Sequence, residues 1–540
     1  MLDNLPILSM ITFSPLIGVI ILLFIRQDQG KIIKTVAIAS TFVPLLLSAW
    51  VYIQFNVGDG NPQFQESMNW INVPLNTEGI QQVSSFFIEF KYALAIDGLS
   101  LTLVFLTALV TSMAALSSIY IKKRWKTFYV LFLLLEVGIF GVFMAQDLFL
   151  FFLFFEITLI PMFFLIGIWG NMEKERAAIQ FLIYNGIGSA IMLIAFVIII
   201  TTAGFQEIST QEGITIYYSG NIETITNNLL YNAESYVNLQ SEGNPFYMSD
   251  QLKWVLFIML VIAFGIKLPI FPFHTWMLKV HAEAPPSVVM IHSGILLKMG
   301  AFGLIKFGIL LFPNEAYQWA WVLALLGIIN ILYGAILAFV QKDLRLVLAY
   351  SSISHMGIVL IGLASFNMIG LQGAVYQLIS HGLISSLLFL MVGVIYERTQ
   401  TTELNQLGGL AKTIPFISAI LLFAGLASLG LPALSGFIAE FLSFAGLFET
   451  MKIYTIIGTI GIILTAVYVL RAILRITFGP VIEGHPVIKD ARLIEALPMI
   501  TLVSFIVLLG VYPSVIINPL QQTVENFDQI INSFTNKMGG

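Results

Sequence analysis

Residues 264–283 read FGIKLPIFPFHTWMLKVHAE, and this stretch decides how the rest of the chain is interpreted. A long apolar run carries Lys267 and then meets Pro269 and Pro272. Lysine costs roughly 2.5–3.5 kcal/mol in the middle of a membrane, and proline interrupts helical hydrogen bonding. Unwound backbone at membrane depth persists only where protein or water lines it. The stretch therefore predicts a broken helix with an ion site, as in transporters; a proline kink with a lysine that reaches the interface is the alternative.

The composition is that of a polytopic membrane protein. The 540 residues are 58% hydrophobic and 10% charged, and the mean hydropathy is +0.92. Apolar runs long enough to cross a bilayer recur along the chain, and we expect about fourteen spans. They lie near 5–25, 32–54, 96–120, 127–146, 148–169, 177–203, 253–273, 286–311, 317–340, 344–365, 368–396, 414–448, 453–477 and 494–513.

Lysine and arginine are distributed unevenly between the two sets of loops. Of the 25 basic residues, 18 fall in odd-numbered loops, four in even-numbered loops or the tail, and three inside spans. Because basic loops stay in the cytoplasm, this distribution predicts that both termini lie on the outer side of the membrane. The two long polar segments, about 55–95 and 204–252, are expected to be outer loops rather than domains.

Two apolar runs share a Leu-Pro interruption. GIKLPIFPF lies in the seventh span and SLGLPALSGFIAE in the twelfth, and these two spans run in opposite directions. The pattern predicts an all-α polytopic membrane protein with two inverted five-helix repeats, each with a broken helix. The expected divisions are 1–126 for spans 1–3, 127–311 for the first repeat (spans 4–8), 312–477 for the second repeat (spans 9–13), and 478–540 for span 14 and the tail.

Ionisable residues lie inside several spans of the first half. Glu156 is central in the fifth span, DLFLFFLFFEITLIPMFFLIGIWG, and Glu136 lies deep in the fourth. A carboxylate in hydrocarbon needs a cation or a proton, and Lys267 is the expected partner of Glu156. Lys298 of the eighth span is the next cation, and Lys306 follows eight residues later, nearly on the same helix face. Several such groups favour a proton or ion path over static ion pairs between helices.

The second half carries a matching polar set. His355 lies in the tenth span, His381 in the eleventh, and Glu440 follows the break of the twelfth. Their polar neighbours at helical spacing are Ser351, Gln377 and Ser385. Because neutral imidazole both donates and accepts, a proton relay is favoured over plain hydrogen bonding between helices. His292, alone beside Ser293, is expected only to hold helices together.

Several classes of function are excluded by what the sequence lacks. With no cysteine, thiolate-ligated iron–sulfur clusters and disulfides are impossible, so redox chemistry must lie on another chain. There is no dinucleotide fingerprint and no P-loop, and no basic, aromatic surface indicates a nucleic acid. No metal site is expected. The lipid bilayer is the partner that the composition predicts.

Five motifs carry a resemblance to a known family: FFEITLIPMFFLIGIWG, FGIKLPIFPFHTWMLKVHAEAP, GILLKMGAFGL, AYSSISHMG and SGFIAEF. They resemble the antiporter-like subunits of respiratory complex I, most of all the M-type subunit, across spans 3–13. The resemblance implies a coupled pair in spans five and seven, a span-eight lysine, two central-axis histidines, a span-twelve carboxylate and a further carboxylate. These residues are, in that order, Glu156, Lys267, Lys298, His355, His381, Glu440 and Glu136.

What the resemblance implies about function is a proton-translocating subunit in the membrane arm of an NADH–quinone oxidoreductase. It implies a bacterial inner-membrane location and L-type and N-type subunits as neighbours. No cofactor is expected on this chain, and NADH, FMN, iron–sulfur clusters and quinone are expected on partner subunits. The sequence departs from the family pattern at His292, where a small or apolar residue is expected, and in the length of 204–252.

Two other functions remain open from the sequence. A subunit of a multisubunit Na⁺/H⁺ antiporter shares Glu156, Lys267 and Lys298 by type. IPMFFLIGIWG and the histidines of the second half favour complex I over that alternative. The other is a passive scaffold, in which the buried ion pairs only hold helices together and removal of Lys267 affects stability alone.

Overall fold

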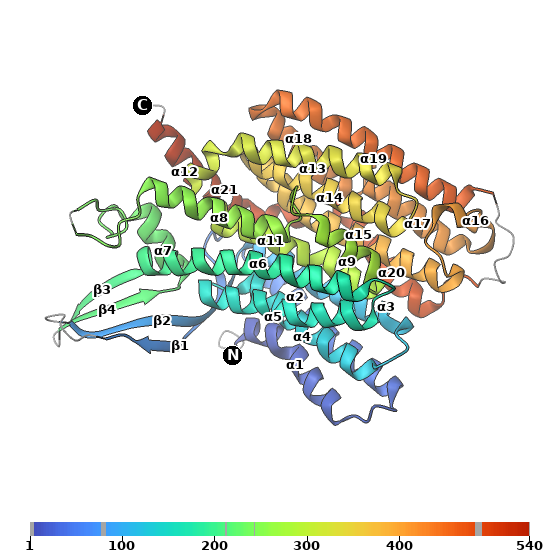
Figure 1. Cartoon of the computed structure of the whole chain (residues 1–540), viewed down its shortest axis with the longest axis horizontal. Helices are drawn as coiled ribbons and strands as arrows, with labels where there is room; N and C mark the ends of the chain where they lie inside the picture. The colour runs from blue at the N-terminus through green and yellow to red at the C-terminus, as the bar shows by residue number, and fades with distance from the viewer. Residues whose placement is uncertain (1–4, 77–82, 211–212, 242, 481–488, 539–540) are drawn as a thin grey trace.

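The computed structural model describes residues 5–76, 83–210, 213–241, 243–480 and 489–538. The chain forms a bundle of long helices with a small sheet at one end (Figure 1). In the described part, twelve helices are long and apolar enough to cross a membrane. The prediction of a helical polytopic membrane protein is confirmed. The two predicted spans outside those twelve are the interrupted ones, which are built from shorter helices.

The helices of the first half begin and end close to the predicted spans. In chain order they are α1 (Ile7–Phe24), α2 (Gly30–Gln54), α3 (Gly98–Ser117) with the 3-10 turn η1 (Ser118–Tyr120), α4 (Trp125–Met144), α5 (Leu148–Trp169), α6 (Lys174–Thr202), α8 (Asp250–Lys267) and α9 (Thr275–Glu283). The eighth predicted span is one run of α10 (Pro286–Ile291), η3 (His292–Leu296), α11 (Leu297–Gly303) and η4 (Leu304–Ile309). Its segments η3 and η4 are π-helical, so helical phase is shifted twice along this run.

The second half follows the same order of long and interrupted helices. Its elements are α12 (Pro313–Gln318), α13 (Ala320–Val340), α14 (Leu344–Ala364), α15 (Met368–Thr399), η5 (Leu404–Gln406), α16 (Leu410–Thr413), α17 (Pro415–Ser428), α18 (Ser435–Thr450), α19 (Lys452–Phe478) and α20 (Leu493–Val511). Helices α13 and α14 approach closely because glycine lines their contact. A Cβ added at Gly334 would lie 2.7 Å from the backbone nitrogen of Ser354.

Short polar side chains fix where several of these helices start. The carboxylate of Asp147 accepts hydrogen bonds from backbone nitrogens in the first turn of α5, the nearer at 2.9 Å. Asp343 does the same for α14 at 2.7 Å and Asn367 for α15 at 2.9 Å. Each satisfies a backbone donor that has no partner within its own helix.

The first break lies between α8 and α9, as predicted, and side chains hold its backbone. The amide oxygen of Asn330 accepts from the backbone nitrogen of Phe271 at 2.8 Å, and its amide nitrogen donates to the carbonyl of Pro269 at 3.3 Å. The indole nitrogen of Trp276 donates to the carbonyl of Ile266 at 3.1 Å. Protein groups therefore supply the hydrogen bonds that the interrupted helix lacks.

The second break lies between α17 and α18, also as predicted. Gly430 has a φ of +76° there, and a Cβ at this residue would lie 2.5 Å from a carboxylate oxygen of Glu440. Glycine is needed because it alone combines this backbone conformation with so close an approach. The hydroxyl of Ser380 donates to that of Ser435, the first residue of α18, at 2.8 Å.

The two long polar segments form a sheet together, which the sequence did not predict. The strands β1 (Gln63–Pro74), β2 (Val83–Ile96), β3 (Phe205–Thr210) and β4 (Gly213–Ser219) pair in the order β1-β2-β4-β3. Neighbouring strands of one segment are antiparallel, whereas β2 and β4, from different segments, are parallel. The second segment also contains α7 (Ile222–Thr226) and the π-helical η2 (Asn227–Tyr231). The prediction of plain loops was wrong.

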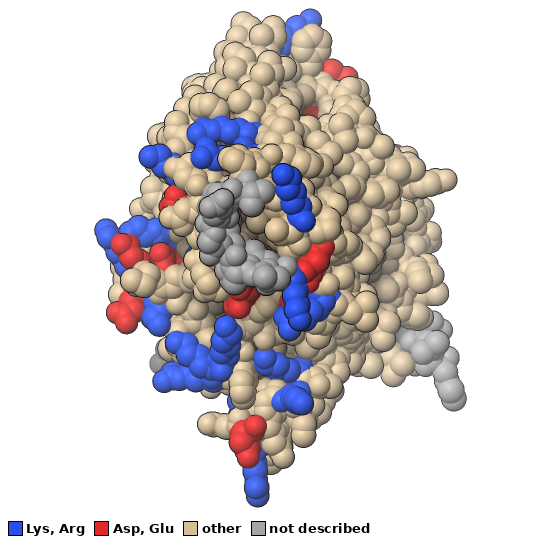
Figure 2. All heavy atoms as spheres, turned by 90° about the vertical axis from the view of Figure 1, so that its right-hand side faces the viewer, with Lys and Arg blue, Asp and Glu red and all other residues tan. Residues whose placement is uncertain are grey.

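The two ends of the bundle differ in character. The strands, α7 and α12 lie at one end, and both described termini lie toward it (Figure 1). Lysine and arginine gather on the opposite end, which faces the viewer in Figure 2. The carboxyl-terminal segment, expected only as a tail, is a helix, α21 (Ser514–Met538). It packs against α3, α12, α15 and α20 and so belongs to the folded bundle.

Candidate functional site

Lys298 lies at the junction of the two halves of the chain. Its side chain, on α11, is fully buried. Its ammonium nitrogen is 2.5 Å from the carbonyl oxygen of Ser293, to which it donates. The same nitrogen is 2.8 Å from Nδ1 of His381 on α15. A lysine of the first half therefore bonds directly to a histidine of the second half.

His355 and Glu440 extend this contact through the second half. The ring centroids of His355 and His381 are 5.4 Å apart. Nδ1 of His355, on α14, lies 3.2 Å from the amide nitrogen of Gln377 and 3.8 Å from a carboxylate oxygen of Glu440 on α18. Lys298, His381, His355 and Glu440 thus form a continuous buried row, which we call the polar row.

A small cavity lies beside the two histidines of the polar row. It measures about 10 Å³, close to the room that one water needs. His355 and His381 line it together with four serines, Ser351, Ser352, Ser385 and Ser428. Ser428 is also 3.4 Å from Nε2 of His355. One water held by these hydroxyls would connect the two imidazoles without any movement of the helices.

The two carboxylates predicted for the first half are both incompletely hydrogen-bonded. Glu136 on α4 is fully buried, and one of its oxygens accepts from the hydroxyl of Thr111 at 2.7 Å. Its other oxygen is buried without a partner, as is one oxygen of Glu156 on α5. Because a buried oxygen without a hydrogen bond costs about 1–3 kcal/mol, both groups are sites where water or a proton stabilises the structure.

Lys267, the last residue of α8, is buried among aromatic rings. Its nitrogen lies 4.9 Å from the ring centroid of Phe155 and 5.6 Å from that of Phe181. Of the ion pairs among described residues, none joins Lys267 to Glu156 within 4.0 Å. We expect the two groups to interact either directly or through one water, and of these the direct ion pair is not formed. Glu156 still acts on Lys267 electrostatically, and the contact through one water stays a prediction.

Lys306 does not continue the line from Lys298, contrary to the expected shared face. It forms an ion pair with Asp97, the residue that precedes α3 and caps it. The π-helical segment η4 begins between the two lysines, which shifts the helical phase and turns Lys306 toward another neighbour. Burial raises the pKa of Asp97, but Lys306 beside it and the hydrogen bonds from Ser100 together outweigh that effect and leave this pKa below its usual value.

A histidine pair was missed in the sequence. Nε2 of His281 on α9 and Nδ1 of His292 on η3 are 2.9 Å apart. Both side chains are buried, at 1% and 0% exposure. His281 received no role from the sequence, and His292 was interpreted as a residue that only holds helices together. The sequence signal for the pair was that one histidine lies on each side of the turn at 284–286, within a few residues of it.

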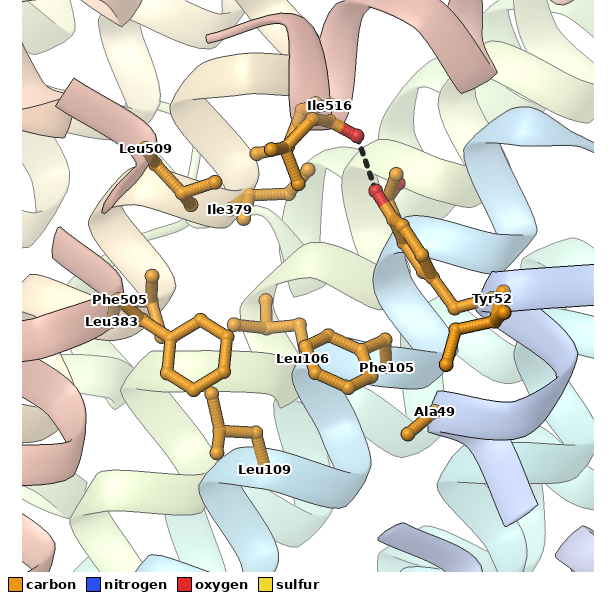
Figure 3. A pocket seen from close by; sticks show the side chains of 13 residues that line it. Ala49, Tyr52, Phe105, Leu106, Leu109, Ile379, Leu383, Phe505, Leu509 and Ile516 are labelled. Atoms are coloured by element: carbon orange, nitrogen blue, oxygen red, sulfur yellow. Dashed lines mark hydrogen bonds between the residues drawn. The ribbon is translucent and has the colours of Figure 1, made fainter. Parts of the chain in front are cut away.

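An apolar cavity of about 250 Å³ lies between α2, α3, α15, α20 and α21 (Figure 3). Ile379 and Leu383 line it, two residues to either side of His381 along the helix. Its polar groups are used locally: the hydroxyl of Tyr52 donates to the carbonyl of Val515, and that of Thr102 to the backbone of its own helix. Because no ionisable group except tyrosine lines it, this cavity offers nothing to a proton path.

Among the described residues, no group of three or more histidine, aspartate or glutamate side chains is arranged to hold a metal ion. The side chains that the structure brings together are hydrogen-bonding and titratable groups in series. Imidazole, ammonium and carboxylate groups in series have the chemistry that a proton relay needs.

Comparison with known sequences places the chain in a family. The profile of the family described as "NADH:quinone oxidoreductase/Mrp antiporter, TM" matches residues 145–465. NADH-quinone oxidoreductase subunit M of Rickettsia bellii is 35% identical over 530 residues, 97% of this chain and 98% of that protein. The chloroplastic NAD(P)H-quinone oxidoreductase chain 4 of Chlorokybus atmophyticus is 36% identical over 98% of both chains.

Solved structures agree with the sequence comparison. A chain of respiratory complex I from Thermus thermophilus with bound NADH superposes with a TM-score of 0.78 and 27% identity, covering 97% of this chain and 99% of that one. A chain of the archaeal membrane-bound sulfane sulfur reductase gives a TM-score of 0.77 at 27% identity, over 95% of this chain and 77% of that one. The chain therefore belongs to the NADH:quinone oxidoreductase and Mrp antiporter membrane-subunit family, and within it to the subunit M type.

Proposed function

We propose that this chain is a proton-translocating subunit in the membrane arm of an NADH–quinone oxidoreductase. The polar row carries the proposal, because it connects both halves of the chain through buried titratable groups. The names of the relatives supply the complex to which such a row would belong. NADH, FMN, iron–sulfur clusters and quinone then reside on partner subunits, and L-type and N-type subunits are the neighbours in the membrane.

The polar row and the ionisable groups of the first half have separate roles in the proposed movement of a proton. Glu156 and Lys267 are the coupled pair of the first half, and a change in the charge of either alters the field at the next lysine. Lys298 passes a proton to His381 along their 2.8 Å contact. His355 receives it through the serine-lined cavity, and Glu440 holds it before release. Glu136 is a second carboxylate that tunes the charge of the first half.

The two halves are proposed to be inverted repeats, with the divisions 1–126, 127–311, 312–477 and 478–540. Support comes from the order of packing. Helices α4, α5, α6 and α8 contact one another in sequence, and α13, α14, α15 and the broken α17–α18 follow the same order. Each set contains one broken helix, and each break lies beside a residue of the proposed path, Lys267 in one and Glu440 in the other.

The expected sidedness follows from the basic end of the molecule. Basic loops stay on the cytoplasmic side, so the end rich in lysine and arginine faces the cytoplasm of a bacterial inner membrane. The sheet and both termini then face the periplasm. Protons move from the basic end toward the sheet end when the pump works in the respiratory direction.

Proton transport by the purified complex tests the function. The complex that contains this chain is reconstituted into liposomes, and NADH with a quinone is added. We expect acidification on the side of the sheet end that persists without Na⁺ and collapses with a protonophore. Co-purification of flavin and iron–sulfur subunits is the second readout. Na⁺ efflux driven by a proton gradient, in a preparation without flavin, would identify an antiporter and contradict the proposal.

The absence of cysteine makes sidedness directly measurable. Ser241 lies in the outer segment and Gln27 in the loop between α1 and α2, and both side chains are exposed. With a membrane-impermeant thiol reagent on intact cells, we expect labelling of Ser241→Cys and none of Gln27→Cys. Permeabilised cells, in which both should react, are the control. The reverse pattern on intact cells would invert the orientation.

A further inference from the structure

The His281–His292 pair is a hydrogen-bonded unit that the polar row does not include. The rings are nearly perpendicular, with an interplanar angle of 88° and centroids 5.0 Å apart. His292 opens the π-helical segment η3, and Lys298 follows two residues after that segment ends. π-Helical turns of this kind occur frequently at functional sites.

We call the two ring nitrogens that take no part in the bond between the rings the open ends of the pair. Each imidazole has two nitrogens, and the bond between the rings uses one from each. The other two, Nδ1 of His281 and Nε2 of His292, are buried and have no hydrogen-bond partner among the residues that the structure describes. Because an unsatisfied buried nitrogen costs about 1–3 kcal/mol, each open end favours a bound water or an arriving proton.

His292 and Lys267 lie against the same aromatic ring. The ring of His292 lies 5.4 Å from Trp276 and 6.1 Å from Phe181. The same Phe181 ring is 5.6 Å from the nitrogen of Lys267. Lys298 follows His292 by six residues on the same helical run. Lys267 and Lys298, which the proposed mechanism charges and discharges, are therefore neighbours of the pair in space and along the chain.

The residue after His281 is hydrogen-bonded to the wall of a hollow at the basic end of the bundle. The carbonyl of Ala282, the next residue, accepts a hydrogen bond from Arg345 at 3.0 Å. Arg345 lines a hollow of about 160 Å³, whose polar wall also includes Ser117, Ser287, Tyr396 and Glu397. This volume is enough for several waters. Ser287 lies at the start of the same helical run as His292, little more than one turn away.

We propose that the His281–His292 pair is a proton relay that supplies Lys267 and Lys298 from the hollow at the basic end. This inference rests on the proposed function. A proton from the hollow binds Nδ1 of His281, and the proton on Nε2 crosses to Nδ1 of His292. The proton on Nε2 of His292 then leaves toward the lysines. One proton enters and one leaves, and rotation of the two rings restores the starting tautomers.

The competing explanation is that the pair only holds α9 against the eighth span. The two explanations differ in what happens when one histidine is replaced. A relay fails when either ring is lost, so the loss in the double variant equals that in each single variant. Two packing residues instead contribute separate losses of stability, and neither changes the sensitivity of pumping to deuterium.

The test uses the complete complex in liposomes with four variants: His281→Gln, His292→Gln, His292→Leu and the double glutamine variant. Glutamine keeps hydrogen bonding but cannot carry a proton at neutral pH. We expect each variant to assemble and to lower the initial pumping rate by about tenfold or more, equivalent to about 1.4 kcal/mol. We expect a larger rate ratio between H₂O and D₂O, because proton delivery becomes limiting.

Ser386→Ala is the matched control. This buried serine of α15 donates to the carbonyls of Met290 on α10 and Gly382 on its own helix, so its loss loosens the packing of the eighth span against α15 without touching the pair. It should pump at the unaltered rate. Normal pumping by His292→Leu overturns the relay, and so do losses that multiply in the double variant. If the unaltered complex moves no protons, the proposed function itself fails, which separates that failure from failure of the relay.

Discussion

A complex that carries Lys298→Met is expected to assemble and to lose proton pumping together with most of its coupled quinone reduction. The nitrogen of Lys298 joins the two halves of the chain through its 2.8 Å contact with His381. Methionine fills similar space without a charge or a proton, and replacing a buried charge by an apolar group of similar volume preserves packing. We expect a fall of about 100-fold, because the path is interrupted and no parallel residue takes over.

The measurement combines pumping in inverted vesicles with two electron-transfer assays. Quinone reduction should fall with pumping, whereas electron transfer from NADH to an artificial acceptor ahead of the quinone site should persist. The control is Lys306→Met combined with Asp97→Asn, which removes the other ion pair of the same helical run. Asparagine retains the helix cap at residue 97. Pumping by Lys298→Met at the normal proton-to-electron ratio would exclude Lys298 from the path.

Glu156→Gln should have the second-largest effect. Glutamine has the shape of glutamate but no charge, so the field that Glu156 exerts on Lys267 disappears while packing remains. We expect at least a tenfold loss of pumping and of coupled quinone reduction, with normal assembly. Because glutamine has nearly the volume of glutamate, the substitution leaves no void at this half-buried position.

The comparison for this variant is Glu136→Gln. One oxygen of Glu136 is held by Thr111, and glutamine can keep that bond, so a smaller loss is expected. Assembly is checked from the flavin content of the purified complex, and pumping is expressed per NADH oxidised. If the Glu156→Gln complex is intact and its proton-to-electron ratio is unchanged, this carboxylate is structural and the proposed coupling with Lys267 is incorrect.

The features of the fold that depend on residues close together in the sequence could be predicted. The Leu-Pro interruption of an apolar run predicted both breaks, with Lys267 as a further signal for the first, and runs of apolar residues predicted the spans. The sheet could not be predicted in the same way. Its central pairing joins β2 to β4, more than a hundred residues apart, and Val83 pairs with Ile214 there. No local pattern specifies a parallel partner at that distance.

For the candidate site, the sequence predicted residue types better than their partners. Lys298 and His381 were each selected, but their contact depends on how α11 packs against α15. The expected shared face of Lys298 and Lys306 is not formed, because the π-helical segment η4 begins between the two lysines and alters the helical phase. Glu156 and Lys267 were expected to interact directly or through one water, and the sequence could not decide between the two; the nitrogen of Lys267 lies 4.9 Å from the ring centroid of Phe155.

The sheet also limits how this molecule can move. Its strands tie the chain between α2 and α3 to the chain between α6 and α8, and β2 leads straight into Asp97, which anchors Lys306. Rocking of the amino-terminal helices against the helices of the first repeat would have to break the parallel pairing of β2 with β4. All four strands lie between residues 63 and 219, so this restraint applies to the first half of the chain and leaves the contact between the two halves to helix packing alone.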